Sequence, residues 1–250
     1  MERLKDKVAV VTGAGRGLGK VYSLKMAEEG AKLVVSDILE KEVQQTAEEI
    51  RAKGGSALWL RVDVTSEQDT LRMAAEAVRE FGRIDILVNN AGLYYGITRK
   101  LFTEIPLEEW DRMMAINVKG PWLCSRAIFP QMKKQGKGKI INISSESVFA
   151  GSKNLSHYIT SKAAVIGLTR DLAAELGQYG IRVNVLAPGF TDTAASRTIG
   201  SIEKYDTSRI PLGCVQQPED LVGAIIFFAS DESDFITGAT LMIDGGRVMY

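Results

Sequence analysis

Residues 8–20 of the chain read VAVVTGAGRGLGK, and this stretch decides the fold that the sequence predicts. Its first five residues are apolar or β-branched without alternation, which is typical of a strand buried on both faces. A glycine-rich turn follows, and helical spacing begins at Gly17. Glycine lets the backbone approach a ligand closely, and the first N–H groups of a helix stabilise phosphate. The stretch therefore predicts a strand, a phosphate-binding turn and a helix in succession.

The spacing of the glycines narrows the kind of phosphate site. Gly13, Gly17 and Gly19 fit the pattern TGxxxGxG, whereas GxGxxG fails because Leu18 stands where its third glycine should be. A P-loop is a poor alternative, since the Gly-Lys pair at 19–20 lacks the hydroxyl residue that should bind magnesium next. We expect the pyrophosphate of a dinucleotide here, contacted by Gly13, Arg16, Gly17, Leu18 and Gly19.

The same alternation of strand and helix continues along the whole chain. Apolar runs predict strands at 8–12, 32–36, 57–62, 84–89, 139–144, 181–187 and 240–244, and helical spacing predicts helices at 17–29, 40–53, 67–81, 107–134, 156–178 and 218–229. Continuously apolar strands separated by helices indicate a parallel sheet covered on both faces. The predicted fold class is α/β, a doubly wound seven-stranded sheet that binds its ligand at the carboxyl edge of the strands.

No repeat or Pro/Gly-rich linker divides the sequence, so we expect one domain over residues 1–250. The segment 190–211 is the one long stretch of unclear structure. A loop of this length in a compact domain is usually a lid or a binding loop, and a poorly ordered connection is the alternative. We predict a substrate lid at 190–211.

Composition excludes several classes of partner. The chain of 250 residues has 31 Lys plus Arg against 31 Asp plus Glu, so it offers no large basic field to nucleic acid or to a membrane surface. Its longest apolar stretch, 222–229, is far shorter than the roughly 20 residues of a membrane span, and the amino terminus lacks a secretory pattern. We expect a soluble, cytoplasmic protein with a small-molecule substrate.

Cysteine and histidine usage excludes further chemistry. Cys124 and Cys214 lie far apart without a CxxC partner, so a disulfide framework has little support. His157 is the single histidine, which leaves no zinc site of the Cys/His type, and no GxSxG elbow occurs for a Ser-His-Asp triad. We expect no metal site, and proton transfer must use other residues.

The end of the second predicted strand carries Asp37, where an acid can accept hydrogen bonds from the ribose of an adenosine. A carboxylate repels a 2′-phosphate, which favours NAD. Arg16 keeps NADP as the alternative, because it can pair either with that phosphate or with Asp37 itself. A cap before Glu40 is the structural alternative for Asp37. The other strand ends at this edge add Asp63, Val64, Asn90, Ala91 and Gly92 to the expected cofactor site.

Six motifs now point to one family. They are TGAGRGLG at 12–19, NNAG at 89–92, INVKG with Asn117, INISS at 141–145, YITSK at 158–162, and Pro188-Gly189. In order and spacing they resemble the short-chain dehydrogenase/reductase family over nearly the whole chain. The resemblance implies a Rossmann fold, an oxidoreductase that uses a nicotinamide dinucleotide, and a homotetramer in which the long helices pair across subunits.

Tyr158 and Lys162 are the expected centre of proton transfer. They are four residues apart in a helical pattern and so share one face. An ammonium about 4 Å from the phenol would stabilise the phenolate by roughly 4 kcal/mol at an effective dielectric near 20, which predicts a pKa of Tyr158 about three units below its ordinary value. Tyr158 would then act as general base or acid near neutral pH.

The resemblance implies roles for further residues. Ser145 matches the family serine that hydrogen-bonds the substrate oxygen, with Ser144 as its rival. Asn117 matches the asparagine that holds a water towards Lys162, and Lys162 also holds the nicotinamide ribose. The catalytic set is thus Asn117, Ser145, Tyr158 and Lys162, and the nicotinamide end of the cofactor is expected to meet Tyr158, Lys162, Pro188, Gly189, Phe190, Thr191 and Thr193.

The substrate is the least specified feature. Segments 3–7, 81–95, 157–170 and 218–246 look most like secondary-alcohol dehydrogenases of the 1-phenylethanol dehydrogenase type, and less like pyridoxal 4-dehydrogenase. Aromatic residues favour an aryl or cyclic alcohol. Glu146 either points to solvent or selects a polar or cationic substituent. The expected pocket residues are Tyr94, Tyr95, Ser145, Ser147, Phe149, Leu155, Tyr158 and Phe190.

Three functions therefore stand as hypotheses. The first is the NAD-linked interconversion of a secondary alcohol and a ketone. The second is an NADPH-dependent reductase of 3-oxoacyl thioesters, which Arg16 supports. The third, a nucleotide-sensing protein without activity, is disfavoured by the intact Asn-Ser-Tyr-Lys set.

Overall fold

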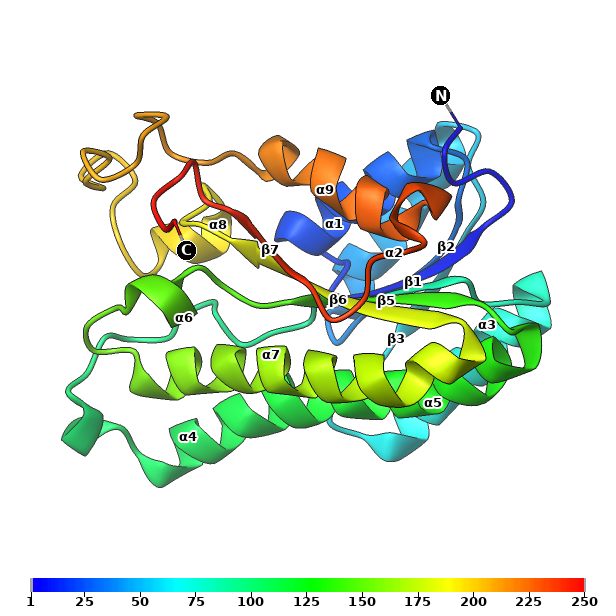
Figure 1. Ribbon diagram of the computed structural model, residues 1–250, viewed down its shortest axis with the longest axis horizontal. Coiled ribbons are helices and arrows are strands. Elements are labelled where there is room, and N and C mark those ends of the chain that lie inside the picture. The colour runs from blue at the N-terminus through cyan, green and yellow to red at the C-terminus, as the bar shows by residue number, and fades with distance from the viewer. Residues whose placement is uncertain (1, 250) are drawn as a thin grey trace.

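A parallel sheet runs through the middle of the molecule, as the computed structural model shows for residues 2–249 (Figure 1). Its seven strands lie in the order β3-β2-β1-β4-β5-β6-β7, and every neighbouring pair is parallel. The predicted doubly wound sheet is confirmed. The strands are β1 (Val8–Thr12), β2 (Lys32–Asp37), β3 (Ala57–Arg61), β4 (Ile86–Asn89), β5 (Gly138–Ile143), β6 (Ile181–Pro188) and β7 (Thr240–Ile243).

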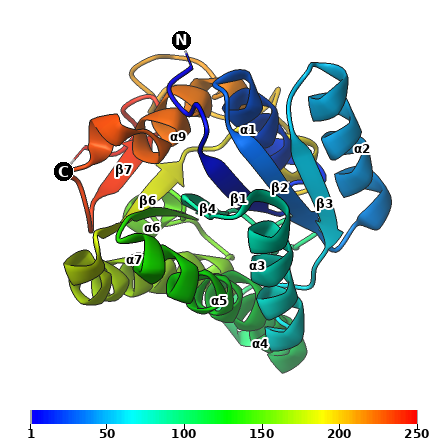
Figure 2. The same cartoon turned by 90° about the vertical axis from the view of Figure 1, so that its right-hand side faces the viewer.

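Helices cover both faces of this sheet (Figure 2). One face carries α1 (Gly17–Glu28), α2 (Glu40–Ala52) and α9 (Val222–Ala229); the other carries α3 (Glu67–Phe81), α4 (Leu107–Met114), α5 (Gly120–Gln135) and α7 (Ser156–Leu176). Successive strand residues point to opposite faces, so Ala9 and Val11 join one apolar core while Val8 and Val10 join the other. This two-sided burial is the reason why the strands read as continuous apolar runs.

The predicted helix at 107–134 is interrupted in the structure. Between α4 and α5 the segment Ala115–Lys119 is π-helical. Single π turns are frequent at functional sites, and this one contains Asn117, whose side chain is buried. At the start of α5, a Cβ on Gly120 would lie 2.9 Å from Val64 Cγ2, so glycine allows α5 to approach the end of β3 closely.

The segment 190–211 has partial structure. It contains the short helix α8 (Ala194–Arg197), and Thr191 forms an isolated parallel bridge with Gln216. The guanidinium of Arg197 binds both carboxylate oxygens of Asp192 at 2.8 Å, and the ring of Phe190 stacks on Tyr205 with 4.3 Å between centroids. The segment lies beside the carboxyl ends of the strands, together with α6 (Ser147–Ala150) (Figure 1).

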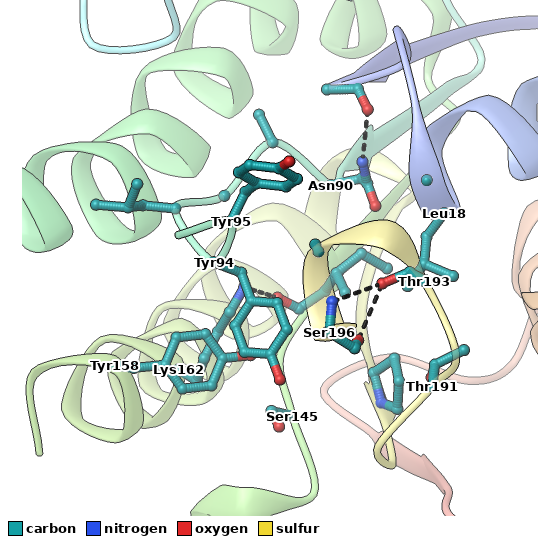
Figure 3. A pocket seen from close by; sticks show the side chains of 18 of the residues that line it. Leu18, Asn90, Tyr94, Tyr95, Ser145, Tyr158, Lys162, Thr191, Thr193 and Ser196 are labelled. Carbon is teal, nitrogen blue, oxygen red and sulfur yellow. Dashed lines mark hydrogen bonds between the residues drawn. The ribbon is translucent and has the colours of Figure 1, made fainter. Parts of the chain in front are cut away.

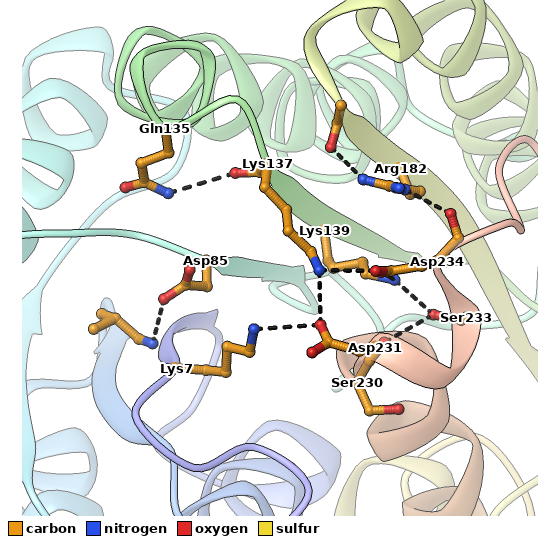
Figure 4. Close-up of polar contacts among 12 residues, drawn as sticks. Lys7, Asp85, Gln135, Lys137, Lys139, Arg182, Ser230, Asp231, Ser233 and Asp234 are labelled. Atoms are coloured by element: carbon orange, nitrogen blue, oxygen red, sulfur yellow. Dashed lines mark hydrogen bonds and ion pairs between the residues drawn. The ribbon is translucent and has the colours of Figure 1, made fainter.

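The opposite edge of the sheet is held by a network of ion pairs (Figure 4). Lys137 Nζ lies 2.9 Å from Asp231 Oδ1 and 2.8 Å from Asp234 Oδ2, and the buried Lys139 Nζ lies 2.7 Å from Asp234 Oδ1. Lys7, beside β1, also pairs with Asp231. The network joins β5, the residues before β1 and the turn after α9, far from the carboxyl edge.

No helix within residues 2–249 has the length and apolar character that crossing a membrane requires.

Candidate active site

A large cavity of about 820 Å³ lies at the carboxyl edge of the strands (Figure 3). The glycine turn after β1 and the ends of β2, β3 and β4 form its nucleotide half. The end of β5, the start of α7 and the segment after β6 form its catalytic half. Nearly all of the residues expected from the sequence line this one cavity, with Gly19 and Asn117 just behind its wall and Phe149 outside it.

The glycine turn is held against the segment that follows β4. Asn90 Nδ2 donates to the carbonyls of Thr12 and Gly13, both at 3.0 Å. A Cβ on Gly13 would lie 2.7 Å from Ala91 Cα, and Gly13 has a positive φ of 65°. A Cβ on Gly19 would lie 2.1 Å from the carbonyl oxygen of Gly13, so only glycine allows α1 to begin there.

Gly17 shows that the turn fits a pyrophosphate. It has a positive φ of 55°, and no atom lies within 4 Å of the place where its Cβ would be, so its backbone faces open space in the cavity. The first N–H groups of α1 are directed at that space and would stabilise negative charge. The residues present therefore match the phosphate-binding role expected of them.

Asp37 supports the glycine turn directly. Its Oδ2 accepts the N–H of Gly15 at 2.9 Å, and its Oδ1 accepts the N–H of Leu39 at 3.0 Å. The pairing of Arg16 with Asp37 that the sequence allowed is not what the structure has. The Arg16 guanidinium instead lies over the ring of Tyr95, 4.1 Å from its centroid. Cation–π stacking thus holds Arg16 and Tyr95 together at the cavity wall.

Ser144, Ser145 and Tyr158 all line the catalytic half of the cavity, but the two serines differ in what their hydroxyls bind. Ser145 and Tyr158 line the same cavity, and Ser147 Oγ donates to Ser145 Oγ at 2.9 Å. Ser144 Oγ donates to the carbonyl of Lys162 at 2.8 Å and is buried. The hydroxyl of Ser144 is therefore used inside the fold, and we expect Ser145 to be the serine that meets a substrate.

The expected lowering of the Tyr158 pKa is wrong for this structure. Burial raises the pKa of Tyr158 above its ordinary value, and the neighbouring Ser145 side chain offsets only part of that rise. Burial also lowers the pKa of Lys162 to about 8. Lys162 Nζ donates to the carbonyl of Ile143 at 2.9 Å and lies 5.9 Å from the centroid of the Tyr158 ring. The ammonium therefore contacts a backbone oxygen, and desolvation dominates both groups.

Asn117 connects three segments around Lys162. Its Oδ1 accepts the N–H of Leu93 at 2.7 Å, and its Nδ2 donates to Ser161 Oγ at 3.0 Å. A Cβ on Gly92 would lie 3.5 Å from both Asn117 Oδ1 and Lys162 Nζ. The π turn thus places Asn117 beside Lys162 and behind the wall of the cavity.

The turn after β6 closes the nicotinamide end. A Cβ on Gly189 would lie 3.0 Å from Asp244 Cα, so this turn passes close to the end of β7. Thr191 Oγ1 donates to Gln216 Oε1 at 2.9 Å, and Thr193 Oγ1 accepts the N–H of Ser196 at 3.1 Å as the cap of α8. The five expected residues from Pro188 to Thr193 all line the cavity.

Apolar side chains wall the substrate end. The rings of Tyr94 and Tyr158 have centroids 5.0 Å apart, and Leu155 packs in the same buried cluster (Figure 3). Phe149 is a correction, because it lines a smaller adjoining pocket and not the main cavity. Ser147 and Phe149 are two positions apart on α6, so about 200° of helix rotation separates their side chains and only Ser147 faces the cavity.

Glu146 does not point to solvent. It is 4% exposed, and its Oε1 accepts Nη1 of Arg247 at 2.9 Å. Arg247 also contacts the hydroxyl of Tyr205. Burial raises the pKa of Glu146, and Arg247 offsets part of that rise. Tyr205 lies in the predicted lid 190–211, whereas Arg247 was not predicted, because nothing in its local sequence shows that the C-terminal segment returns to the cavity.

His157 lies away from this chemistry. Its ring is fully buried, and Nε2 lies 3.1 Å from Glu109 Oε1. Although it precedes Tyr158, it is not among the residues lining the cavity.

A serine, a buried tyrosine and a lysine at the carboxyl edge of a Rossmann sheet define an oxidoreductase site beside a dinucleotide-binding turn. Comparison with known proteins agrees: residues 13–247 match the family described as enoyl-(acyl carrier protein) reductase. The chain belongs to the short-chain dehydrogenase/reductase family.

Relatives align over almost the whole chain. An uncharacterized oxidoreductase of Thermotoga maritima is 43% identical over 250 residues, covering 97% of each protein. The trans-4-hydroxycyclohexanecarboxylate dehydrogenase of Sinomonas cyclohexanicum is 39% identical over 252 residues, covering 98% of this chain and 94% of its own.

Solved structures share the fold. A 7α-hydroxysteroid dehydrogenase in complex with NADH and 7-oxo glycochenodeoxycholic acid has a TM-score of 0.93 at 36% identity, covering 98% of this chain and 95% of its own. The 3-ketoacyl-(acyl-carrier-protein) reductase of Brucella melitensis with NADH has a TM-score of 0.91 at 34% identity, covering 98% and 99%. A third, from Beutenbergia cavernae, holds NADP, with a TM-score of 0.89 at 36% identity and 98% and 97% coverage. Structural neighbours thus bind either NADH or NADP.

Proposed function

We propose that the protein interconverts a secondary alcohol and a ketone with NAD(H), and that the substrate is aryl or cyclic. The observation that carries this is the placement of Ser145 and Tyr158 in one cavity beside an apolar wall of Tyr94 and Leu155. In the oxidative direction the alcohol loses a hydride to NAD⁺ and a proton to the protein, giving the ketone, NADH and H⁺.

The dinucleotide would be held by the residues whose backbone and side chains face the nucleotide half. Its phosphates would lie at the glycine turn, its adenosine ribose at Asp37, and its nicotinamide between Lys162 and the turn from Pro188 to Thr193. When bound, it supplies the acceptor or donor of hydride. NAD is favoured because the Asp37 carboxylate ends β2, and because stacking on Tyr95 engages Arg16. Arg16 keeps NADP as the alternative.

The chain's own residues would then hold and move the proton. The Tyr158 hydroxyl exchanges it with the substrate oxygen, while Ser145 hydrogen-bonds that oxygen as its charge changes. Lys162 holds the cofactor ribose, and Asn117 holds a water that connects Lys162 to the solvent. The apolar wall excludes other water from the reacting carbon. The segment 190–211 serves as a lid, since Phe190 and Tyr205 line the cavity.

A reductase of 3-oxoacyl thioesters using NADPH is the second candidate. The similarity to the 3-ketoacyl-(acyl-carrier-protein) reductase of Brucella melitensis, whose structure holds NADH, favours the thioester substrate as strongly as the cyclohexane relative favours a cyclic alcohol, and Arg16 supports NADPH. A protein that senses nucleotides without turnover is disfavoured by the complete catalytic set around one cavity.

One assay separates these functions. NADH or NADPH change is followed across aryl, cyclic and aliphatic alcohols, their ketones, and a 3-oxoacyl thioester. We expect NAD-linked turnover of cyclic or aryl alcohols, and at least a 10²-fold loss of kcat in Tyr158→Phe, which removes the acid–base group. Unchanged turnover in Tyr158→Phe would refute the mechanism. NADPH-linked thioester reduction alone would establish the second candidate, and NAD binding without any turnover the third.

A further inference from the structure

A polar cluster lies at the substrate end of the cavity, apart from the groups that transfer the proton. It consists of Glu146, Tyr205 and Arg247, and all three line the same cavity as Ser145 and Tyr158. Arg247 Nη1 donates to Glu146 Oε1 at 2.9 Å and contacts the Tyr205 hydroxyl. The cluster therefore joins the turn after β5, the segment 190–211 and the C-terminal segment where a substrate would enter.

Arg247 keeps donors that the cluster does not use. A guanidinium carries five N–H donors in a planar fork. Within residues 2–249, the hydrogen bonds of the Arg247 side chain all start from Nη1, so Nε and Nη2 remain available. Nε and Nη2 form one edge of the fork, and that edge matches the two oxygens of a carboxylate.

Exposure decides which partner of the ion pair a ligand can reach. The Arg247 side chain is 24% exposed, while that of Glu146 is 5% exposed. The second oxygen of Glu146, Oε2, is buried and has no hydrogen-bond partner in the described part of the chain. Arg247 is thus the more accessible member of the ion pair, and the free oxygen of Glu146 is buried.

The surrounding charges favour an anion as well. Asp37 and Asp63 line the nucleotide half of the cavity. Among residues 2–249, Glu146 is therefore the single carboxylate that lines the substrate end, and it is already paired with Arg247. Arg99 lines the same end and offsets part of the rise that burial causes in the pKa of Tyr94. Two guanidinium groups thus face one paired carboxylate.

We propose that Arg247 binds a carboxylate of the substrate, with Glu146 and Tyr205 holding the guanidinium in place. This inference rests on the proposed function and narrows it: the substrate is a secondary alcohol or ketone that carries a carboxylate away from the reacting carbon. Glu146 keeps the arginine paired when no substrate is present, since an unpaired buried charge would be costly.

The experiment compares a carboxylate with its neutral isostere. Oxidation of 3- and 4-hydroxycyclohexanecarboxylate is measured beside the corresponding carboxamides, which have nearly the same shape and no charge. In parallel, binding of the matching oxo acids and oxo amides to the enzyme–NADH complex is measured by calorimetry. We expect the wild-type protein to prefer the carboxylate at least tenfold in kcat/KM and in affinity.

Two variants test the residue. In Arg247→Met the ratio of carboxylate to carboxamide is expected to fall at least tenfold, to about one, mostly through KM. Since this variant leaves Glu146 buried without its partner, Arg247→Met combined with Glu146→Gln removes both charges and should show the same loss of preference in a folded protein. Arg209→Met is the matched control, because Arg209 lines the smaller adjoining pocket and not the main cavity, and its ratio should stay within twofold.

The outcomes separate this inference from the proposed function. The carboxylate site would be overturned if the wild type used and bound acid and amide equally well. It would also be overturned if the double variant lost activity on acid and amide equally. Either result would leave the proposed dehydrogenase function intact. Selective binding of the oxo acid that depends on Arg247, without turnover of any alcohol, would support the site and contradict the proposed function.

Discussion

The ammonium of Lys162 lies in the protein interior, where it donates to the carbonyl of Ile143 and where burial lowers its pKa from 10.5 to about 8. The folded protein thus releases this proton at a lower pH than the unfolded chain does. Between about pH 8 and 10.5 the unfolded chain binds more protons, so stability rises with pH across that window. Below pH 8 the full destabilisation by the buried charge is present.

Lys162→Met should therefore stabilise the fold while abolishing catalysis. At pH 7 we expect the free energy of unfolding to increase by about 1–3 kcal/mol. The lowered pKa of Lys162 corresponds to about 1.36 kcal/mol for each pKa unit, and the lost hydrogen bond subtracts about 1 kcal/mol from that gain. The rise in stability above pH 8 should flatten. Urea unfolding from pH 7 to 10 measures both, with the exposed Lys41→Met on α2 as control. A variant that loses stability at pH 7 would contradict the buried-charge interpretation.

Asp37 decides the cofactor if its charge repels a 2′-phosphate. Asp37→Asn removes the charge and keeps an oxygen that can accept the N–H of Gly15 or Leu39. We expect the ratio of kcat/KM for NADP to that for NAD to rise about tenfold, equivalent to about 1.4 kcal/mol. Adding Arg16→Met should cancel the gain, because the phosphate could draw the Arg16 guanidinium away from Tyr95 and pair with it. A ratio unchanged by Asp37→Asn would show that Asp37 serves only to hold the glycine turn.

At the scale of elements, the π turn between α4 and α5 is the feature that positions the site. Asn117→Ala removes the hydrogen bonds to Leu93 and Ser161, and we expect a loss of about 2 kcal/mol in the free energy of unfolding, about 1 kcal/mol for each. Because Gly92 and Lys162 lie beside Asn117, kcat should fall as well. Ser161→Ala removes the bond to Asn117 and also the bond from Ser161 Oγ to the carbonyl of Tyr158, so it should cost a similar amount, about 2 kcal/mol, without removing the bond to Leu93. Chemical denaturation and steady-state kinetics of both variants check this.

The elements differ in how far the sequence determines them. Strands such as β1 and β6 bury both faces, so short apolar runs predicted them to within one or two residues. The glycine turn was predictable because positive φ and close backbone contacts demand glycine at Gly13 and Gly19. The π turn was not predictable, because the helical period of the sequence continues through it. It accompanies the contact of Asn117 with Leu93, in a loop distant along the chain.

The same limit applies to the site. Tyr158 and Lys162 lie in a predicted helix, and Ser145 follows a predicted strand directly. That these three residues meet at one edge of the sheet therefore follows from the order of the strands. Glu146 and Arg247 are 101 positions apart in the sequence, and their pairing depends on how the C-terminal segment returns over the cavity. The predicted pKa of Tyr158 was wrong because it rests on the distance between Tyr158 and Lys162 alone, whereas burial of the two groups depends on the tertiary structure.

At the scale of the whole molecule, the outer side of α3, α4 and α5 leaves apolar side chains exposed. Leu71 is 52% exposed, Trp122 43% and Leu107 77%, although these helices already cover one face of the sheet (Figure 2). Contiguous apolar patches mark protein–protein interfaces. We predict that these side chains contact other copies of the chain in a homotetramer.

Trp122→Glu should then break the tetramer. Light scattering of the wild-type protein should give about four times the chain mass of 27.3 kDa, and the variant a smaller mass, because a carboxylate in an apolar helix–helix contact loses its hydration without gaining a partner. Lys41→Glu, a charge change on the exposed side of α2, should keep the wild-type mass. A wild-type mass near 27.3 kDa would contradict the tetramer. A tetrameric Trp122→Glu protein would instead show that the copies associate through another face.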